Sequence, residues 1–171
     1  FHMRKDLSII LPAYNEVDNI KEVVSSILEF VPTHTNNFEV IIVDDGSEDN
    51  TGQVIDELAK EYPQVIAIHH PFNRGYGATL RSGFKAARGD LIFFTDGDGQ
   101  FDIRQMPKLV GLIRNGADLA CGYRIKRADS PIRVLNAGFY NAVVRLLFKL
   151  NVKDIDCAFK LFKRKVIEDI E

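Results

Sequence analysis

The sequence predicts an α/β domain with a Rossmann-like, mostly parallel sheet and helices on both faces. Short apolar segments alternate with longer segments of helical periodicity along the chain. The composition, 46% hydrophobic and 27% charged, is that of an ordinary globular protein. Strands that alternate with helices are joined by right-handed crossovers, which makes neighbouring strands parallel.

Five apolar segments bounded by polar residues or glycine are predicted to be buried strands. They cover residues 7–13, 38–43, 65–69, 90–95 and 118–122.

Five segments with helical periodicity lie between and after these strands. They cover residues 16–30, 50–62, 77–87, 103–115 and 132–150. Because ligands of such sheets bind beyond the carboxyl ends of the strands, the polar residues that follow each strand are the candidates for function.

The length of 171 residues suits one domain. We expect residues 1–6 to be a tag remnant and a basic start, and residues 7–171 to form the domain. The apolar runs are far shorter than the roughly 20 residues of a membrane-spanning helix, and no secretory leader is recognised, so we expect a cytoplasmic protein. Cys121 and Cys157 lack metal-type spacing and are expected to be reduced thiols.

Positive charge is concentrated at the C-terminal end. The net charge is −2 overall, but residues 121–171 hold 11 Lys and Arg against 6 Asp and Glu, a net charge of +5. This end is either a solvated surface or a contact for something anionic, such as a pyrophosphate, a lipid phosphate or a membrane face. No nucleic-acid-binding motif is present, so a nucleic acid partner is not expected.

The most informative segment is the end of the fourth predicted strand, residues 93–100. Asp96 and Asp98 are one residue apart, and side chains at i and i+2 point to the same side of a strand. Two carboxylates placed in this way suit Mg²⁺ or Mn²⁺. An Asp-Gly-Asp-Gly sequence is also ordinary turn chemistry, and that alternative stays open at this point.

Other strand ends carry polar residues as well. Residues 12–16, 44–47 and 122–124 each follow a predicted strand, and all should lie along one edge of the sheet. Taken singly, they could open helices or form tight turns. Together, they form an acidic rim that would repel an anionic substrate unless a cation bridged the two.

Several segments of this chain, in this order, strongly resemble the inverting family 2 glycosyltransferases of GT-A fold. These segments are residues 12–16, 43–47, 73–77, 87–90 and 96–100. Within that family, residues 122–124 and 154–160 are similar to segments of the dolichyl-phosphate mannose and polyprenyl-phosphate glucose synthases. Those enzymes usually continue further, so we expect a catalytic domain truncated at its C-terminus.

The resemblance implies a nucleotide-sugar donor. Its residues for the base and ribose are Pro12, Tyr14, Glu16, Val43 and Asp45. A carboxylate such as Asp45 accepts a base N–H, which uracil and guanine both offer, so both UDP- and GDP-sugars remain open.

The same resemblance implies a metal on the diphosphate, held by Asp96, Asp98 and Gln100. The backbone of Gly97 would leave room for the sugar, and Arg74 would lie near the donor, although its segment could equally be a structural turn. Nucleotidyltransferases also place acids at strand ends, but they need a basic glycine-rich loop after the first strand, which this chain lacks.

A polyprenyl phosphate is the preferred acceptor. Its phosphate oxygen is ionised at neutral pH and needs no strong base, whereas arginines must hold it against the diphosphate. Arg124 and Arg133 are the candidates, and with Asp98 and Asp156 they are the predicted catalytic residues. A soluble transferase with a sugar hydroxyl acceptor would instead need Asp154 or Asp156 as a base.

Residues 139–150 are predicted to form a helix with a wide apolar face. Core packing or peripheral contact with a membrane would each explain that face.

Taken with the family resemblance, the sequence predicts transfer of a hexose from a UDP- or GDP-sugar to a polyprenyl phosphate. A hydroxyl-directed glycosyltransferase, a nucleotidyltransferase and a non-catalytic sugar-nucleotide-binding domain are the alternatives.

Overall fold

A computed structural model describes residues 5–123 and 157–168. The predicted helix at 132–150 and the segment 124–156, with its candidate acceptor residues, lie outside the described residues. No helix within the described part is long and apolar enough to cross a membrane.

The described strands form one six-stranded sheet in the order β3-β2-β1-β4-β6-β5. Strand β1 pairs in parallel with β2 and β4, and β2 pairs in parallel with β3. Strand β6 is antiparallel to both β4 and β5. The strands are β1 (Lys5–Ala13), β2 (Phe38–Asp44), β3 (Val65–His69), β4 (Gly89–Thr95), β5 (Leu119–Cys121) and β6 (Phe159–Lys163).

The mostly parallel sheet is as predicted, and each of the five predicted strands is present within a few residues of its expected bounds. Strand β6 was not predicted. It lies between β4 and β5, so the fourth and fifth strands along the chain are not neighbours. The sequence interpretation treated residues 154–160 as a functional segment; of these, Asp154 and Asp156 lie outside the described residues, while Phe159 is buried at the start of β6.

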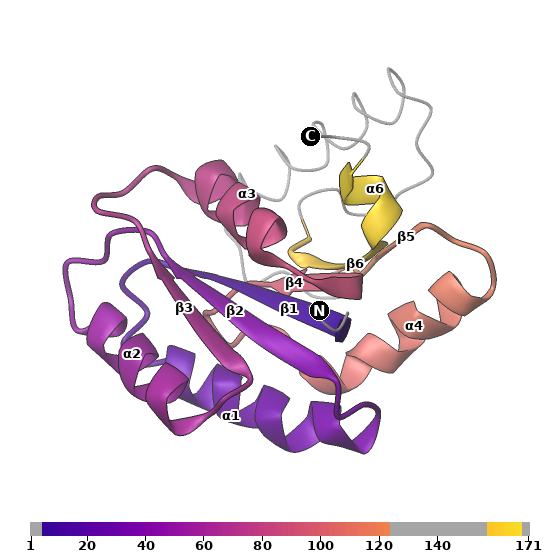
Figure 1. Ribbon diagram of the computed structural model, residues 1–171, viewed down its shortest axis with the longest axis horizontal. Coiled ribbons are helices and arrows are strands. Elements are labelled where there is room, and N and C mark those ends of the chain that lie inside the picture. Colours follow the sequence, from indigo (N-terminus) through magenta and orange to yellow (C-terminus); the bar gives the residue numbers. More distant parts are fainter. Residues whose placement is uncertain (1–4, 124–156, 169–171) are drawn as a thin grey trace, which may run out of the picture.

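Helices cover both faces of the sheet, as expected (Figure 1). Helices α1, α2 and α4 lie on one face, and α3 and α6 lie on the other. Two short 3-10 helices, η1 and η2, adjoin α1 and α4. The bounds are α1 (Ile20–Phe30), η1 (Val31–Thr33), α2 (Thr51–Glu61), α3 (Tyr76–Ala86), η2 (Ile103–Gln105), α4 (Met106–Arg114) and α6 (Arg164–Glu168).

Helix α1 begins four residues later than predicted. Asn15 adopts a left-handed conformation with φ of 56°, and the carbonyl of Glu16 accepts hydrogen bonds from the backbone N–H groups of Asn19 and Ile20. A turn therefore precedes the helix. It leaves residues 14–16 in a loop at the carboxyl end of β1.

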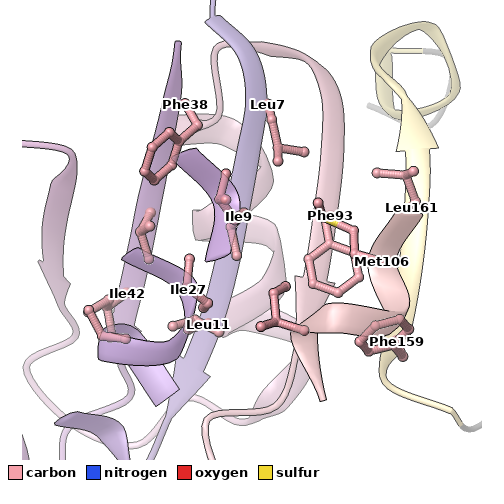
Figure 2. Packing of buried hydrophobic residues seen from close by; sticks show 14 of the residues in the cluster. Leu7, Ile9, Leu11, Ile27, Phe38, Ile42, Phe93, Met106, Phe159 and Leu161 are labelled. Atoms are coloured by element: carbon pink, nitrogen blue, oxygen red, sulfur yellow. The ribbon is translucent and has the colours of Figure 1, made fainter. Parts of the chain in front are cut away.

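The core has two parts, one on each face of the sheet. On β1, Ile9 and Leu11 pack towards α1, while Ile10 packs towards α3, and all three are fully buried. Figure 2 shows the larger part, in which Phe93 of β4 and Phe159 of β6 lie close together. Strands buried on both faces explain the unbroken apolar runs in the sequence.

Candidate nucleotide-sugar site

A cleft of about 370 Å³ lies at the carboxyl ends of β1, β2 and β4. It brings together most of the predicted donor residues, although they are distant in the sequence. The predicted residues that line it are Pro12, Tyr14, Glu16, Asp45, Asp96, Gly97 and Asp98.

The loop after β1 is bonded to the loop after β2. The backbone N–H of Asn15 donates to Ser47 Oγ at 3.0 Å, and the N–H of Glu48 donates to Asn15 Oδ1 at 2.9 Å. The backbone N–H of Glu16 donates to Thr51 Oγ1 at 2.8 Å. These bonds fasten the two loops to each other, and of the residues that they join, Glu16 lines the cleft.

Asp45 is the most heavily bonded side chain of the site. Its residue is only 3% exposed, its Oδ1 accepts from the backbone N–H of Arg74 at 3.0 Å, and its Oδ2 accepts from Gly75 N–H at 2.8 Å. Burial alone would raise the pKa of Asp45, but hydrogen bonds from His70, the two backbone groups and Thr79 outweigh burial and lower it. Asp45 is therefore a stable carboxylate that also ties down the loop before α3.

A buried histidine is hydrogen-bonded to Asp45. His70 is 6% exposed, and its Nδ1 lies 2.6 Å from Asp45 Oδ1 while its Nε2 lies 2.8 Å from Ser82 Oγ. This chain of bonds connects the end of β3 to helix α3. The sequence interpretation missed it because it considered residues 73–77 after the third strand but not His69 and His70, which lie directly at the end of that strand.

The two acids after β4 both face the cleft. Tyr76, the first residue of α3, donates its hydroxyl to Asp96 Oδ1 at 2.9 Å. Burial and the charge of Asp96 raise the pKa of the Tyr76 phenol, which keeps it a hydrogen-bond donor. Asp98 Oδ1 accepts from the backbone N–H of Gln100 at 3.0 Å, an Asx-type turn. Both the metal interpretation and the turn interpretation of this segment thus have a physical basis.

The donor set suits a hard divalent cation. Asp96 and Asp98 supply carboxylate oxygens in one cleft, and Mg²⁺ and Mn²⁺ prefer such oxygens while retaining water or phosphate ligands. Within residues 5–123 and 157–168, no group of three or more His, Cys, Asp or Glu forms a complete protein cage. The described residues thus supply part of a coordination shell, to which water and a bound diphosphate could add the remaining ligands.

Three predicted residues of the described part do not line this cleft. Val43 is fully buried in the core on the α3 face, so its side chain is not available to a nucleobase. Arg74 contributes its backbone to Asp45, while its side chain is exposed. Gln100 is exposed on the turn after Asp98. Arg124, Arg133, Asp154 and Asp156 lie outside the described residues.

A neighbouring cleft of about 410 Å³ lies between α1 and η2. Asp98 lines both clefts, so it can be approached from two sides. Thr95 also lines the second cleft, and its buried hydroxyl has no hydrogen-bond partner among the described residues. The predicted nucleotide residues are gathered in the first cleft, which is the better candidate for the donor.

The fold and its acidic cleft define a GT-A domain. The chain belongs to glycosyl transferase family 2, since the sequence model of that family matches residues 8–171. The solved structures that share the fold include two that contain Mn²⁺ with a nucleotide or a nucleotide sugar. One is a mannosyltransferase from Pyrobaculum calidifontis in complex with GDP-Man and Mn²⁺, with a TM-score of 0.71 and 22% identity over 99% of this chain and 47% of that one. The other is glucosyl-3-phosphoglycerate synthase from Mycobacterium tuberculosis with Mn²⁺, UDP and its product, with a TM-score of 0.71 and 24% identity over 95% of this chain and 58% of that one.

Curated relatives are more similar in sequence. Glycosyltransferase AglD of Haloferax volcanii is 36% identical, over 95% of this chain and 27% of the relative. An undecaprenyl-phosphate 4-deoxy-4-formamido-L-arabinose transferase of Shewanella sediminis is 30% identical, over 95% and 49%. A dolichyl-phosphate beta-glucosyltransferase of Trichomonas vaginalis is 31% identical, over 93% and 53%. The chain therefore spans between about a quarter and about half of these relatives' lengths.

Proposed function

We propose that this domain transfers a hexose from a UDP- or GDP-sugar to a polyprenyl phosphate, with inversion at the anomeric carbon and with Mg²⁺ or Mn²⁺. The observation that carries the proposal is that one cleft gathers Asp96 and Asp98 with the strand-end residues of β1 and β2. Family membership and the names of the relatives support it.

The nucleoside would occupy the part of the cleft between the loops after β1 and β2. Tyr14, 41% exposed, offers an aromatic surface there, and Pro12 and Glu16 flank it. To accept an N–H of uracil or guanine, Asp45 would share an oxygen that is already bonded within the protein, because His70, Arg74, Gly75 and Thr79 occupy its roughly four acceptor positions.

The diphosphate would lie beside Asp96 and Asp98. Gln100, on the adjacent turn, would be a further ligand of the metal ion, directly or through water. When bound, a divalent cation offsets the negative charge that develops on the departing diphosphate. Gly97 lets the loop that carries the two acids pack closely on β1 and α1, because a Cβ there would approach Pro12 O to 3.1 Å and Ile20 Cδ1 to 3.2 Å. In this proposal the two acids hold the leaving group, and the glycine between them allows the loop to lie beside the cleft.

The acceptor would be bound by residues of the segment 124–156, which lies outside the described residues. A polyprenyl phosphate is already ionised at neutral pH, so its oxygen attacks without a strong base, while Arg124 and Arg133 hold it next to the diphosphate. Such an acceptor resides in a membrane, and we propose that the domain works at a membrane surface. Asp156 would become the base only for a hydroxyl acceptor.

A thermal-shift screen of UDP- and GDP-sugars, with and without Mn²⁺, tests the donor. A ligand that binds the native state raises its stability in proportion to ln(1 + [L]/Kd), so the true donor should raise Tm only when Mn²⁺ is present. Asp96→Asn and Asp98→Asn should remove this shift. Asp90→Asn, an exposed acid at the other end of β4, is the matched control and should keep it.

Transfer is then measured by mass spectrometry with undecaprenyl phosphate, dolichyl phosphate and a free sugar as competing acceptors. Formation of the lipid-linked product is expected. Glycosylation of the free sugar alone would exclude the lipid phosphate, and donor binding with no transfer by the full-length protein would favour a non-catalytic binding domain.

A further inference from the structure

Tyr76 links helix α3 to an acid that is expected to bind the metal. Its hydroxyl donates to Asp96 Oδ1 at 2.9 Å, and both residues line the cleft. A single phenol bond restrains the rotation of the carboxylate but does not prevent it from binding a cation, since the carboxylate has about four acceptor positions. Tyr76 is thus in the position of an outer-shell partner of the metal ligand.

The position of Tyr76 depends in turn on Asp45. The carboxylate of Asp45 accepts the backbone N–H groups of Arg74 and Gly75, the two residues immediately before Tyr76. Gly75 has φ of 88°, a conformation that suits glycine, and it forms the turn that opens α3. One short loop therefore connects the nucleoside end of the cleft to its diphosphate end.

We propose that Tyr76 is a positioning residue that orients Asp96 for the divalent cation, and that Asp45 sets Tyr76 in place through residues 74 and 75. This inference rests on the proposed function. Hydrogen bonds that orient a metal ligand reduce the cost of ordering it, and their loss typically weakens metal affinity 10–100-fold. Asp45 accordingly contributes to metal binding although it does not contact the metal.

Binding of Mn²⁺ provides a test that does not depend on turnover. The free Mn²⁺ signal in electron paramagnetic resonance is titrated for the wild type and Tyr76→Phe, with Mn²⁺ alone and with UDP or GDP added, and no acceptor present. We expect Tyr76→Phe to weaken Mn²⁺ binding by about 10-fold. Because Tyr76 is 49% exposed, the Tm of the Tyr76→Phe variant without metal should stay close to that of the wild type.

Tyr62→Phe is the matched control. Tyr62 is the C-cap of α2 and lies just before β3, away from the carboxyl ends of the strands where the cleft lies. Tyr62→Phe removes the same hydroxyl group as Tyr76→Phe. Its Mn²⁺ affinity should equal that of the wild type. In turnover assays with the full-length protein, Tyr76→Phe should raise the KM for Mn²⁺ more than it lowers kcat, which a general loss of folding would not do.

A double-mutant cycle tests the link to Asp45. Asp45→Asn should weaken Mn²⁺ binding in the wild type and have much less effect when Tyr76 is already Phe, because both changes act through the same bond to Asp96. If Asp45→Asn does not fold, Asn73→Ala replaces it, since the exposed Asn73 Oδ1 also accepts Gly75 N–H, at 3.1 Å.

The outcomes separate the two proposals. Equal or tighter Mn²⁺ binding by Tyr76→Phe would overturn the role of Tyr76 while the proposed function stands. Additive effects in the cycle would overturn the role of Asp45 in placing Tyr76. If the wild type bound no Mn²⁺ even with UDP or GDP, the proposed function and this inference would fall together.

Discussion

Two buried carboxylates lie on or next to β2, at opposite ends of the strand, and they have different partners. Asp45 follows the carboxyl end and is 3% exposed, whereas Glu39 lies near the start and is 1% exposed. The bonds of Asp45 come from a histidine and from the backbone of the loop before α3. Those of Glu39 come from a guanidinium group, a backbone N–H and a serine.

Glu39 forms a closed structural cluster. Its Oε2 accepts from Arg88 Nε at 3.0 Å and Nη2 at 2.8 Å, and its Oε1 accepts from Ser8 Oγ at 2.7 Å and from the backbone N–H of Arg88 at 2.7 Å. The Ser8 bond joins β1 to β2, and the Arg88 bonds join β2 to the residue that precedes β4. The cluster thus connects three neighbouring strands at the end of the sheet away from the cleft.

A structural acid and a functional acid differ in this fold by where their hydrogen bonds lead. A bidentate arginine neutralises Glu39 within the protein. Asp45 is stabilised by a loop whose next residue reaches Asp96, so its bonds extend into the cleft. Residues 87–90 contributed to the family resemblance, yet Arg88 and Gly89 serve the sheet and not the cleft.

The largest expected effect is that of Glu39→Ala. It leaves a guanidinium and a buried hydroxyl without their acceptor, and breaking a buried pair costs about 3–5 kcal/mol; we expect about 3, because Arg88 is partly exposed. Urea unfolding measures the loss. The folded fraction should bind the nucleotide with Mn²⁺ as tightly as the wild type.

Asp45→Asn is the counterpart of that variant. It should weaken binding of the nucleotide with Mn²⁺ by 10-fold or more, which Glu39→Ala should not do. If both variants lost stability and binding to the same extent, the distinction between a structural and a functional edge would be wrong.

The strands β1 to β5 and the mostly parallel character of the sheet could be predicted from the sequence, but the strand order and the contacts between loops could not. Apolar runs identify buried strands, and alternation with helices predicts the parallel pairing that β1 to β4 show. The bond from Tyr76 to Asp96 joins residues 20 positions apart on different elements. No local periodicity reports it, and it depends on the turn at Gly75.

Strand β6 and Val43 illustrate two further limits. The antiparallel β6 enters the sheet after a long connection, and short-range patterns do not indicate where such a strand inserts. Val43 is separated from the cleft by the alternation of β2, which directs its side chain into the core on the α3 face. The register relative to the cleft decides such cases, and only the structure supplies it.

Gly46→Ala should affect both stability and binding. Gly46 has φ of 70°, and a Cβ there would lie 2.4 Å from the backbone carbon of Phe72 and 2.7 Å from Asn73 N. Strain and overpacking together should cost roughly 3 kcal/mol. Because the clash pushes on the loop before α3, nucleotide affinity measured by calorimetry should fall as well. Unchanged nucleotide affinity would show that a displacement of this loop does not alter the cleft.

Gly89→Ala is the corresponding change at the end of the sheet away from the cleft, where Gly89 begins β4. A Cβ there would lie 2.4 Å from Ser8 N and 2.7 Å from Leu7 C, so overpacking should cost about 2 kcal/mol in urea unfolding. Nucleotide affinity should not change. Gly111→Ala, inside α4 with no atom within 4 Å of a new Cβ, is the control and should raise stability by about 0.5–1 kcal/mol.

The smallest expected effect is a pH dependence at His69. Its Nδ1 lies 3.0 Å from Asp44 Oδ2 and its Nε2 lies 3.1 Å from Asp56 Oδ1. Burial would lower the pKa of His69, but the bonds and charges of the two carboxylates outweigh burial and raise it. The stabilisation is therefore fully present below the unfolded pKa of about 6.5 and is lost as pH rises through the folded pKa.

The pH dependence of stability that Asp45 contributes should have the opposite sign. Its lowered pKa gives stability that is lost only in acid, as pH falls through the folded pKa of Asp45.

The side chain of His69 is 37% exposed, so solvent weakens its interactions with the two carboxylates. The difference in unfolding free energy between the wild type and His69→Asn should therefore fall by less than about 1 kcal/mol from pH 5.5 to 8.5. A difference that grew with pH would mean that His69 is held as a neutral imidazole and not as a bridge between two carboxylates.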